Sequence, residues 1–101
     1  MKIKLLMSWD IKPGRENEFF EFIMRDFAPG IHRLGLKVTE IWYTIHGEGP
    51  QMFLGAVTED LQEMNEVIHS NEWHELQGKL QAFVTNFRQK IVHAKTRFQI
   101  F

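Results

Sequence analysis

The chain contains no cysteine, which excludes disulfides, thiolate catalysis and cysteine-ligated zinc or iron–sulfur centres together. Its formal net charge is only −1, so it lacks the basic stripe that nucleic-acid binding requires, and no run of like charges forms a tail. No segment approaches the ~18 consecutive apolar residues of a membrane helix. We therefore expect a cytoplasmic protein with neither a nucleic-acid nor a membrane partner.

The residues that are present indicate one globular domain over 1–101. Hydrophobic residues make up 44% and charged residues 25%, which is ordinary, whereas aromatics at 13% are abundant for so short a chain. The basic and apolar start could be mistaken for a signal peptide. The apolar stretch is broken at Asp10 and no small-residue cleavage site follows it, so a first strand is the better interpretation.

Two segments have helical periodicity. The first runs from Arg15 to about Leu34, and Pro29 should kink it or start a short second turn. The second begins at Asp60, which forms a capping-box pattern with Glu63, and reaches His69. At Ser70 the chain restarts as a longer helix whose apolar stripe is Trp73, Leu76, Leu80, Phe83, Val84 and Phe87.

Strand-like runs surround these helical segments and complete the order β-α-β-β-α-β. This order is typical of the ferredoxin-like unit, an α+β fold with a four-stranded antiparallel sheet and helices on one face. The usual strand order in this fold is 4-1-3-2. The predicted strands are Ile3–Ile11, Lys37–His46, Met52–Thr58 and Lys90–Phe101.

Alternation along each strand divides the side chains between two faces of the sheet. The nearly all-apolar set should lie beneath the helices: Ile3, Leu5, Met7, Trp9, Ile41, Tyr43, Ile45, Phe53, Gly55, Val57, Val92, Ala94, Phe98 and Ile100. The mixed set should form the uncovered face: Lys4, Leu6, Ser8, Asp10, Val38, Glu40, Trp42, Thr44, His46, Met52, Leu54, Ala56, Ile91, His93, Lys95 and Arg97.

The uncovered face is expected to carry a large apolar patch. Left in water, such a patch would exceed what monomers usually expose, and a second sheet covering it would stabilise the pair by several kcal/mol at roughly 25 cal/mol per Å². We therefore predict a homodimer with facing sheets. The patch residues are Leu6, Val38, Trp42, Met52, Leu54 and Ile91.

The chain resembles the dimeric α/β-barrel superfamily, which includes the NIPSNAP-like proteins and the antibiotic-biosynthesis-type monooxygenases. The residues that carry the resemblance are Lys12-Pro13-Gly14, Glu18-Phe19, Gly35-Leu36, Asn71-Glu72-Trp73 and Arg97-Phe98-Gln99-Ile100. The resemblance implies a ferredoxin-like protomer in a dimeric barrel. It does not select an activity, because members range from cofactor-free oxygenases and isomerases to proteins without known activity.

The five histidines do not predict a metal site. His69 and His74 are not spaced for one helical face, and His46 and His93 should lie on opposite edges of the sheet. Nucleotide fingerprints and phosphate-cradling loops are also missing, so we predict no cofactor.

A small-molecule site is expected where polar groups converge on the uncovered face. His46 or His93 would accept a proton and Arg97 would hold the resulting anion. Trp42 would stack on an aromatic substrate. The other predicted ligand-binding residues are Ser8, Asp10, Glu40 and Thr44.

Two functions remain open at this point. The first is binding of a small apolar or aromatic molecule, with cofactor-independent monooxygenase or isomerase chemistry. The second is a non-catalytic dimeric interaction or structural module, in which Glu40, His46 and Arg97 are solvated rim residues and Trp42 anchors the interface.

Overall fold

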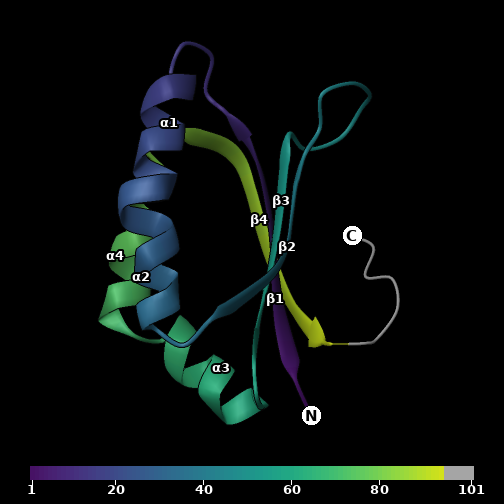
Figure 1. The fold of residues 1–101 in the computed structure, drawn as a ribbon, viewed down its shortest axis with the longest axis vertical. Coiled ribbons are helices and arrows are strands. Elements are labelled where there is room, and N and C mark those ends of the chain that lie inside the picture. The colour runs from purple at the N-terminus through teal and green to yellow at the C-terminus, as the bar shows by residue number, and fades with distance from the viewer. Residues whose placement is uncertain (95–101) are drawn as a thin grey trace.

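A computed structural model of the protein describes residues 1–94. Its elements follow the order β-α-β-β-α-β (Figure 1), with the first helical segment divided into three parts and the second into two. In chain order they are β1 (Ile3–Ile11), α1 (Glu16–Phe22), the π-helical turn η1 (Ile23–Phe27), α2 (Ala28–Arg33), β2 (Lys37–Tyr43), β3 (Met52–Thr58), α3 (Leu61–Ile68), α4 (Asn71–Leu80) and β4 (Val84–His93).

The four strands form one antiparallel sheet in the order β2-β3-β1-β4. All the helices lie on the same side of it, and no described helix covers the other side (Figure 1). The predicted ferredoxin-like α+β fold and strand order are therefore confirmed. Within residues 1–94, no helix combines the length and apolar character needed to span a bilayer.

The helix-covered face carries the core. Trp9 of β1 is fully buried, and its ring stacks on Phe87 of β4 and meets Phe19 and Phe27 edge-on. The indole Nε1–H of Trp9 is buried and has no hydrogen-bond acceptor among the described residues. Phe19, Ile23 and Phe27, which recur every four residues in the first helical segment, are buried in this cluster.

Pro29 is accommodated without breaking the helical path. Proline has no N–H to donate and its ring crowds the preceding turn. The chain widens just before it, where the Ala28 N–H bonds to the Ile23 carbonyl five residues back. The expected kink thus takes the form of the π-helical turn η1.

The helix starts follow local chemistry. Asp60 accepts a hydrogen bond from the Glu63 N–H at 2.9 Å, and Ser70 accepts one from the Trp73 N–H at 3.2 Å. The predicted Asp60 cap is therefore confirmed, and Ser70, where the chain was expected to restart as a helix, caps α4.

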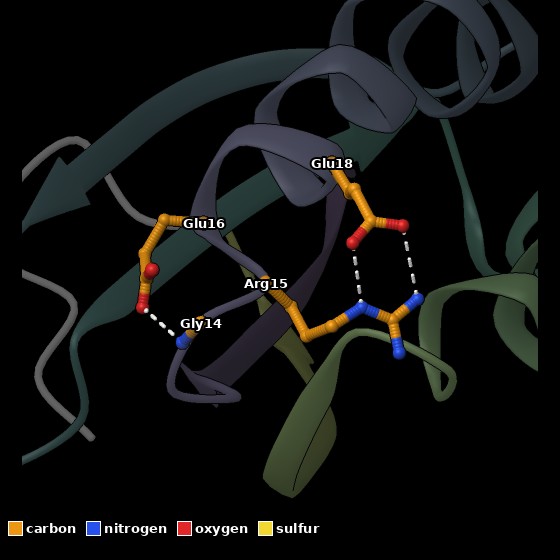
Figure 2. A network of polar contacts seen from close by, with 4 residues as sticks. All are labelled: Gly14, Arg15, Glu16 and Glu18. Atoms are coloured by element: carbon orange, nitrogen blue, oxygen red, sulfur yellow. Dashed lines mark hydrogen bonds and ion pairs between the residues drawn. The ribbon is translucent and has the colours of Figure 1, made fainter.

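The start of α1 is held by charged side chains (Figure 2). The Arg15 guanidinium donates two hydrogen bonds to the Glu18 carboxylate, at 3.0 and 3.3 Å, and Glu16 accepts one from the Gly14 N–H. Arg15 also lies 5.0 Å from the centre of the Phe83 ring, which connects α1 to the segment between α4 and β4.

The predicted boundary of the last strand is wrong. The second helix ends at Leu80 and the chain enters β4 at Val84, so Val84 and Phe87 belong to the strand. They are spaced by three because a β-bulge inserts Asn86, which has φ +55°, and both nevertheless face the core. The bulge therefore imitates helical spacing. Residues 95–101, predicted as strand, lie outside the described part of the chain.

Two strands also present the opposite faces from those predicted. Residues directly opposite in an antiparallel pair share a face, and Leu5 lies opposite both Ala56 and Ile91. Met52, Leu54, Ala56, Ile91 and His93 therefore lie on the helix-covered side, whereas Phe53, Gly55, Val57 and Val92 lie on the other.

Val38 moves to the helix-covered side as well. A second bulge inserts Thr39 between Val38 and Glu40 and reverses the alternation there. The predicted apolar patch is consequently wrong in four of its six members, and only Leu6 and Trp42 remain on the face without helices.

Candidate functional site

The helix-free side of the sheet, called the open face below, brings aromatic and charged side chains together. Among the described residues, its lysine and arginine side chains outnumber its two carboxylates, Asp10 and Glu40, although the whole chain has a net charge of −1. The strand registers assign to it Lys4, Leu6, Ser8 and Asp10 of β1, Lys37, Glu40 and Trp42 of β2, Phe53, Gly55 and Val57 of β3, and Thr85, Arg88, Lys90 and Val92 of β4.

An ion pair crosses the middle of the open face. The Lys4 ammonium donates to the Glu40 carboxylate with an Nζ–Oε1 distance of 2.6 Å. The Lys4 side chain is 7% exposed and that of Glu40 is 34% exposed. The cation is thus almost fully withdrawn from water, and the carboxylate lies between it and the solvent.

Gly55 makes this pair possible. Lys4 and Glu40 belong to strands that are not neighbours, because β3 runs between β1 and β2. A Cβ atom at residue 55 would lie 2.5 Å from Glu40 Oε1, so only glycine leaves the space that the carboxylate occupies. A glycine inside an apolar strand is a sign of such a close approach.

An aromatic pair lies beside the ion pair. Trp42 is two residues beyond Glu40 on β2 and directly opposite Phe53 on β3, and the two rings meet edge-on with centroids 6.1 Å apart. Trp42 is 61% exposed, whereas Trp9 and Trp73 are at most 1% exposed. The open face therefore presents an accessible indole next to a buried charge.

Four of the predicted site residues share this surface. Ser8, Asp10, Glu40 and Trp42 all lie on the open face, with Ser8 opposite both Phe53 and Arg88. Sequence reasoning did not select Lys4, Gly55 or Phe53 as site residues. The isolated glycine in β3 was the available signal, but the face assigned to that strand was wrong.

Asp10 and Thr44 have structural contacts at the end of the sheet. Asp10 accepts hydrogen bonds from the Gln51 N–H at 3.0 Å and from Asn86 Nδ2 at 2.8 Å. Thr44 donates to the Pro50 carbonyl at 3.0 Å, and its N–H bonds to the Gln51 carbonyl. Both residues fix the loop between β2 and β3.

The proposed catalytic trio does not assemble among the described residues. His46 lies in the exposed loop between β2 and β3. His93 lies opposite Ile3 on the helix-covered side, so its predicted place on the uncovered face is wrong. Arg97 is outside the described residues. The strands that lead to His46 and His93 are at opposite edges of the sheet, as predicted.

Other histidines contact the backbone. His69 Nδ1 lies 2.7 Å from the Asn65 carbonyl oxygen, and His74 Nε2 lies 3.1 Å from that of Ile68. Within residues 1–94, no three histidine, aspartate or glutamate side chains are grouped as a metal site would require.

A cleft of about 500 Å³ lies away from the open face. It contains none of the predicted site residues. Its lining joins the loop before β2 to the end of β3 and to α3, and consists of Leu34, Gly35, Thr58, Glu59, Glu63, Glu66, Val67 and Ser70.

Comparison with known proteins identifies the fold. No family model matches the chain, and no curated protein matches it. Among solved structures, a NIPSNAP-like domain protein from Burkholderia xenovorans is 19% identical, with a TM-score of 0.71 over 98% of this chain and 90% of that one.

Two further structures are similar. An ethyl tert-butyl ether D (EthD) family protein from Bacillus halodurans is 14% identical, with a TM-score of 0.75 over 94% of this chain and 100% of that one. A dimeric protein of unknown function with a ferredoxin-like fold, from Bacteroides fragilis, is 14% identical, with a TM-score of 0.64 over 92% and 96%. The chain therefore has the ferredoxin-like fold of the NIPSNAP-like structures.

Proposed function

We propose that two copies of the chain pack with their open faces together and bind a small apolar or aromatic molecule between the sheets. The observation that carries this proposal is the buried Lys4–Glu40 pair beside the exposed Trp42 ring. An apolar wall with a few convergent polar groups is the usual composition of a small-molecule site. The similar protein from Bacteroides fragilis is described as dimeric, which supports the assembly.

The chemistry proposed for this site is cofactor-independent oxygenation or isomerisation of the bound molecule. Both reactions begin when a proton leaves an activated carbon or a phenol. Ser8, Asp10, Glu40 and Trp42 are the predicted residues that share the open face. His46, in the loop that follows β2, is one proposed proton acceptor, and the open-face carboxylate of Glu40 is the other. His93 is not retained as a site residue, because it lies on the opposite side of the sheet.

A non-catalytic dimeric module is the second candidate. It is favoured by the burial of Leu6, Ser8 and Val57, which are at most 6% exposed in the single chain. Part of the open face is thus already closed to a ligand.

Collisional quenching of tryptophan fluorescence by iodide tests the proposal, because Trp42 is the one accessible indole. We expect Trp42 to become protected as the protein concentration rises through the dimerisation range, and Trp42→Phe to abolish the quenchable signal. Mass spectrometry of the purified protein should detect a co-purifying aromatic molecule. A monomer at micromolar concentration, with Trp42 fully quenchable, would exclude both candidate functions.

A further inference from the structure

The Lys4–Glu40 pair has an arrangement that suits proton transfer. Lys4 is covered and Glu40 is half-exposed above it, so a molecule that approaches the open face meets the carboxylate first. A buried ammonium is strongly destabilising without an anionic partner. If Glu40 loses its negative charge by taking up a proton, a second anion must therefore replace it as the partner of Lys4.

We propose that Glu40 accepts a proton from the bound molecule and that Lys4 then holds the anion that is formed. This inference rests on the proposed binding of a small molecule at the open face. The O–H or C–H bond of the ligand breaks, the proton bonds to a Glu40 carboxylate oxygen, and the electron pair stays on the ligand. No oxidant or reductant takes part.

The total charge of the site does not change in this step. Before the transfer, Lys4 is paired with the Glu40 carboxylate; afterwards, Glu40 is neutral and Lys4 is paired with the ligand anion. The buried cation has a counter-ion throughout, which avoids the cost of an isolated charge in a low-dielectric setting.

The surroundings specify the ligand class. The rings of Trp42 and Phe53 offer a surface for a flat aromatic molecule, and Arg88 adds positive charge to the same face. The site thus suits a phenol or an aromatic carbon acid, in which an acidic proton lies next to a group that spreads the negative charge. An aromatic cation would be repelled.

4-Nitrophenol is a suitable probe because its phenolate absorbs visible light and the nitroaromatic ring quenches a nearby indole. Nitrobenzene, which cannot ionise, is the matched neutral probe. Binding of either is read from Trp42 fluorescence, ionisation from absorbance, and proton release from an indicator dye in weak buffer.

We expect the wild-type protein to bind 4-nitrophenol as phenolate at a pH where the free probe is mostly neutral, without releasing a proton to the solvent. Glu40→Gln should bind the phenolate more tightly, because Lys4 has lost its partner, and should release one proton per bound probe. Lys4→Met should weaken phenolate binding by about 10- to 100-fold and leave nitrobenzene binding unchanged.

Two further variants separate this role from a structural one. Lys4→Arg keeps the positive charge and should bind the phenolate as the wild-type protein does. It provides the test of the cation if Lys4→Met folds poorly. Lys37→Met removes an exposed lysine from the same face and should change binding by less than about twofold.

The outcomes distinguish the two proposals. If nitrobenzene binds but 4-nitrophenol stays neutral, or if the wild-type protein releases the proton to solvent, the proton-accepting role is overturned and the binding site stands. If neither probe binds, the proposed small-molecule site is overturned together with this inference.

Discussion

At the residue scale, the ion pair on the open face depends on the absence of a side chain at Gly55. Gly55 has no Cβ, and its absence leaves room for a carboxylate from one strand to reach an ammonium two strands away. The same glycine weakens β3 as a strand, because glycine contributes no side chain to pack. Gly55 therefore lowers the stability of β3 locally, at the place where Glu40 neutralises the buried charge of Lys4.

Gly55→Ala is expected to destabilise the protein by about 1–3 kcal/mol, because the new methyl group displaces Glu40 and leaves Lys4 buried without a partner. Gly78→Ala is the matched control. No heavy atom lies within 4 Å of a Cβ built at Gly78 in α4, so this change should stabilise by about 0.5–1 kcal/mol through helix propensity. Urea denaturation measures both; equal effects would show that the Gly55 space is not needed.

Removing either member of the ion pair should have unequal consequences. Lys4→Met leaves Glu40, which is 34% exposed and can turn to water, so we expect a loss of at most about 1 kcal/mol. Glu40→Gln leaves the ammonium of Lys4 buried beside a neutral amide, and we expect a loss of about 1–3 kcal/mol. The double variant should be more stable than Glu40→Gln alone. Thermal unfolding of the three variants measures these losses of stability. Equal losses for Lys4→Met and Glu40→Gln would contradict the burial of Lys4.

At the element scale, two β-bulges determine which side chains share a face. Val84 and Phe87 in β4, and Val38 and Ile41 in β2, are spaced by three and yet point to the same side. One extra residue, Asn86 or Thr39, stands between each pair. Hydrophobic spacing in these strands therefore does not follow the two-residue repeat.

Asn86 is the residue whose backbone adopts the left-handed region, at φ +55°. Asparagine tolerates this conformation and a β-branched residue does not. We expect Asn86→Val to destabilise by about 1–3 kcal/mol. Asn86→Gly relieves the backbone but removes the hydrogen bond to Asp10, and should be nearly neutral. Chemical denaturation compares the two variants, and a stable Asn86→Val protein would argue against the bulge.

These bulges explain where sequence reasoning succeeded and where it failed. β1 and β3 were predicted with their observed limits, and the helical segments and the Asp60 cap were recognised, because their signals are local. The faces of β3 and β4 were wrong, because the relative register of two strands depends on loops and bulges that leave no periodic signal. The Lys4–Glu40 pair was missed for the same reason, since it requires Gly55 on the correct face.

At the scale of the whole molecule, β2 is one of the two edge strands of the sheet, and most of its side chains are exposed. Ile41 is 51% exposed on the helix-covered side, and Trp42 is 61% exposed on the open face. Ile41 and Trp42 are similarly exposed but lie on opposite sides of the sheet. Substitutions at these two residues can therefore identify which side is used for self-association.

Trp42→Asp is expected to weaken dimerisation at least about tenfold, because it replaces an exposed indole within the proposed contact by a carboxylate. Ile41→Asp should leave the dimer intact, since residue 41 points to the other side of the sheet. Sedimentation velocity over a range of concentrations measures both. If only Ile41→Asp dissociates the dimer, the interface lies on the helix-covered side of the sheet, which would contradict our proposal.

The position of β1 has a consequence for synthesis on the ribosome. This strand is made first but lies between β3 and β4, and Phe87 of β4 stacks on its Trp9. The hydrogen bonds between β1 and β4 therefore cannot form until residues 84–93 have left the exit tunnel. A nascent chain stalled before that point holds an incomplete hydrophobic cluster, so this sheet is completed only after β4 has been translated.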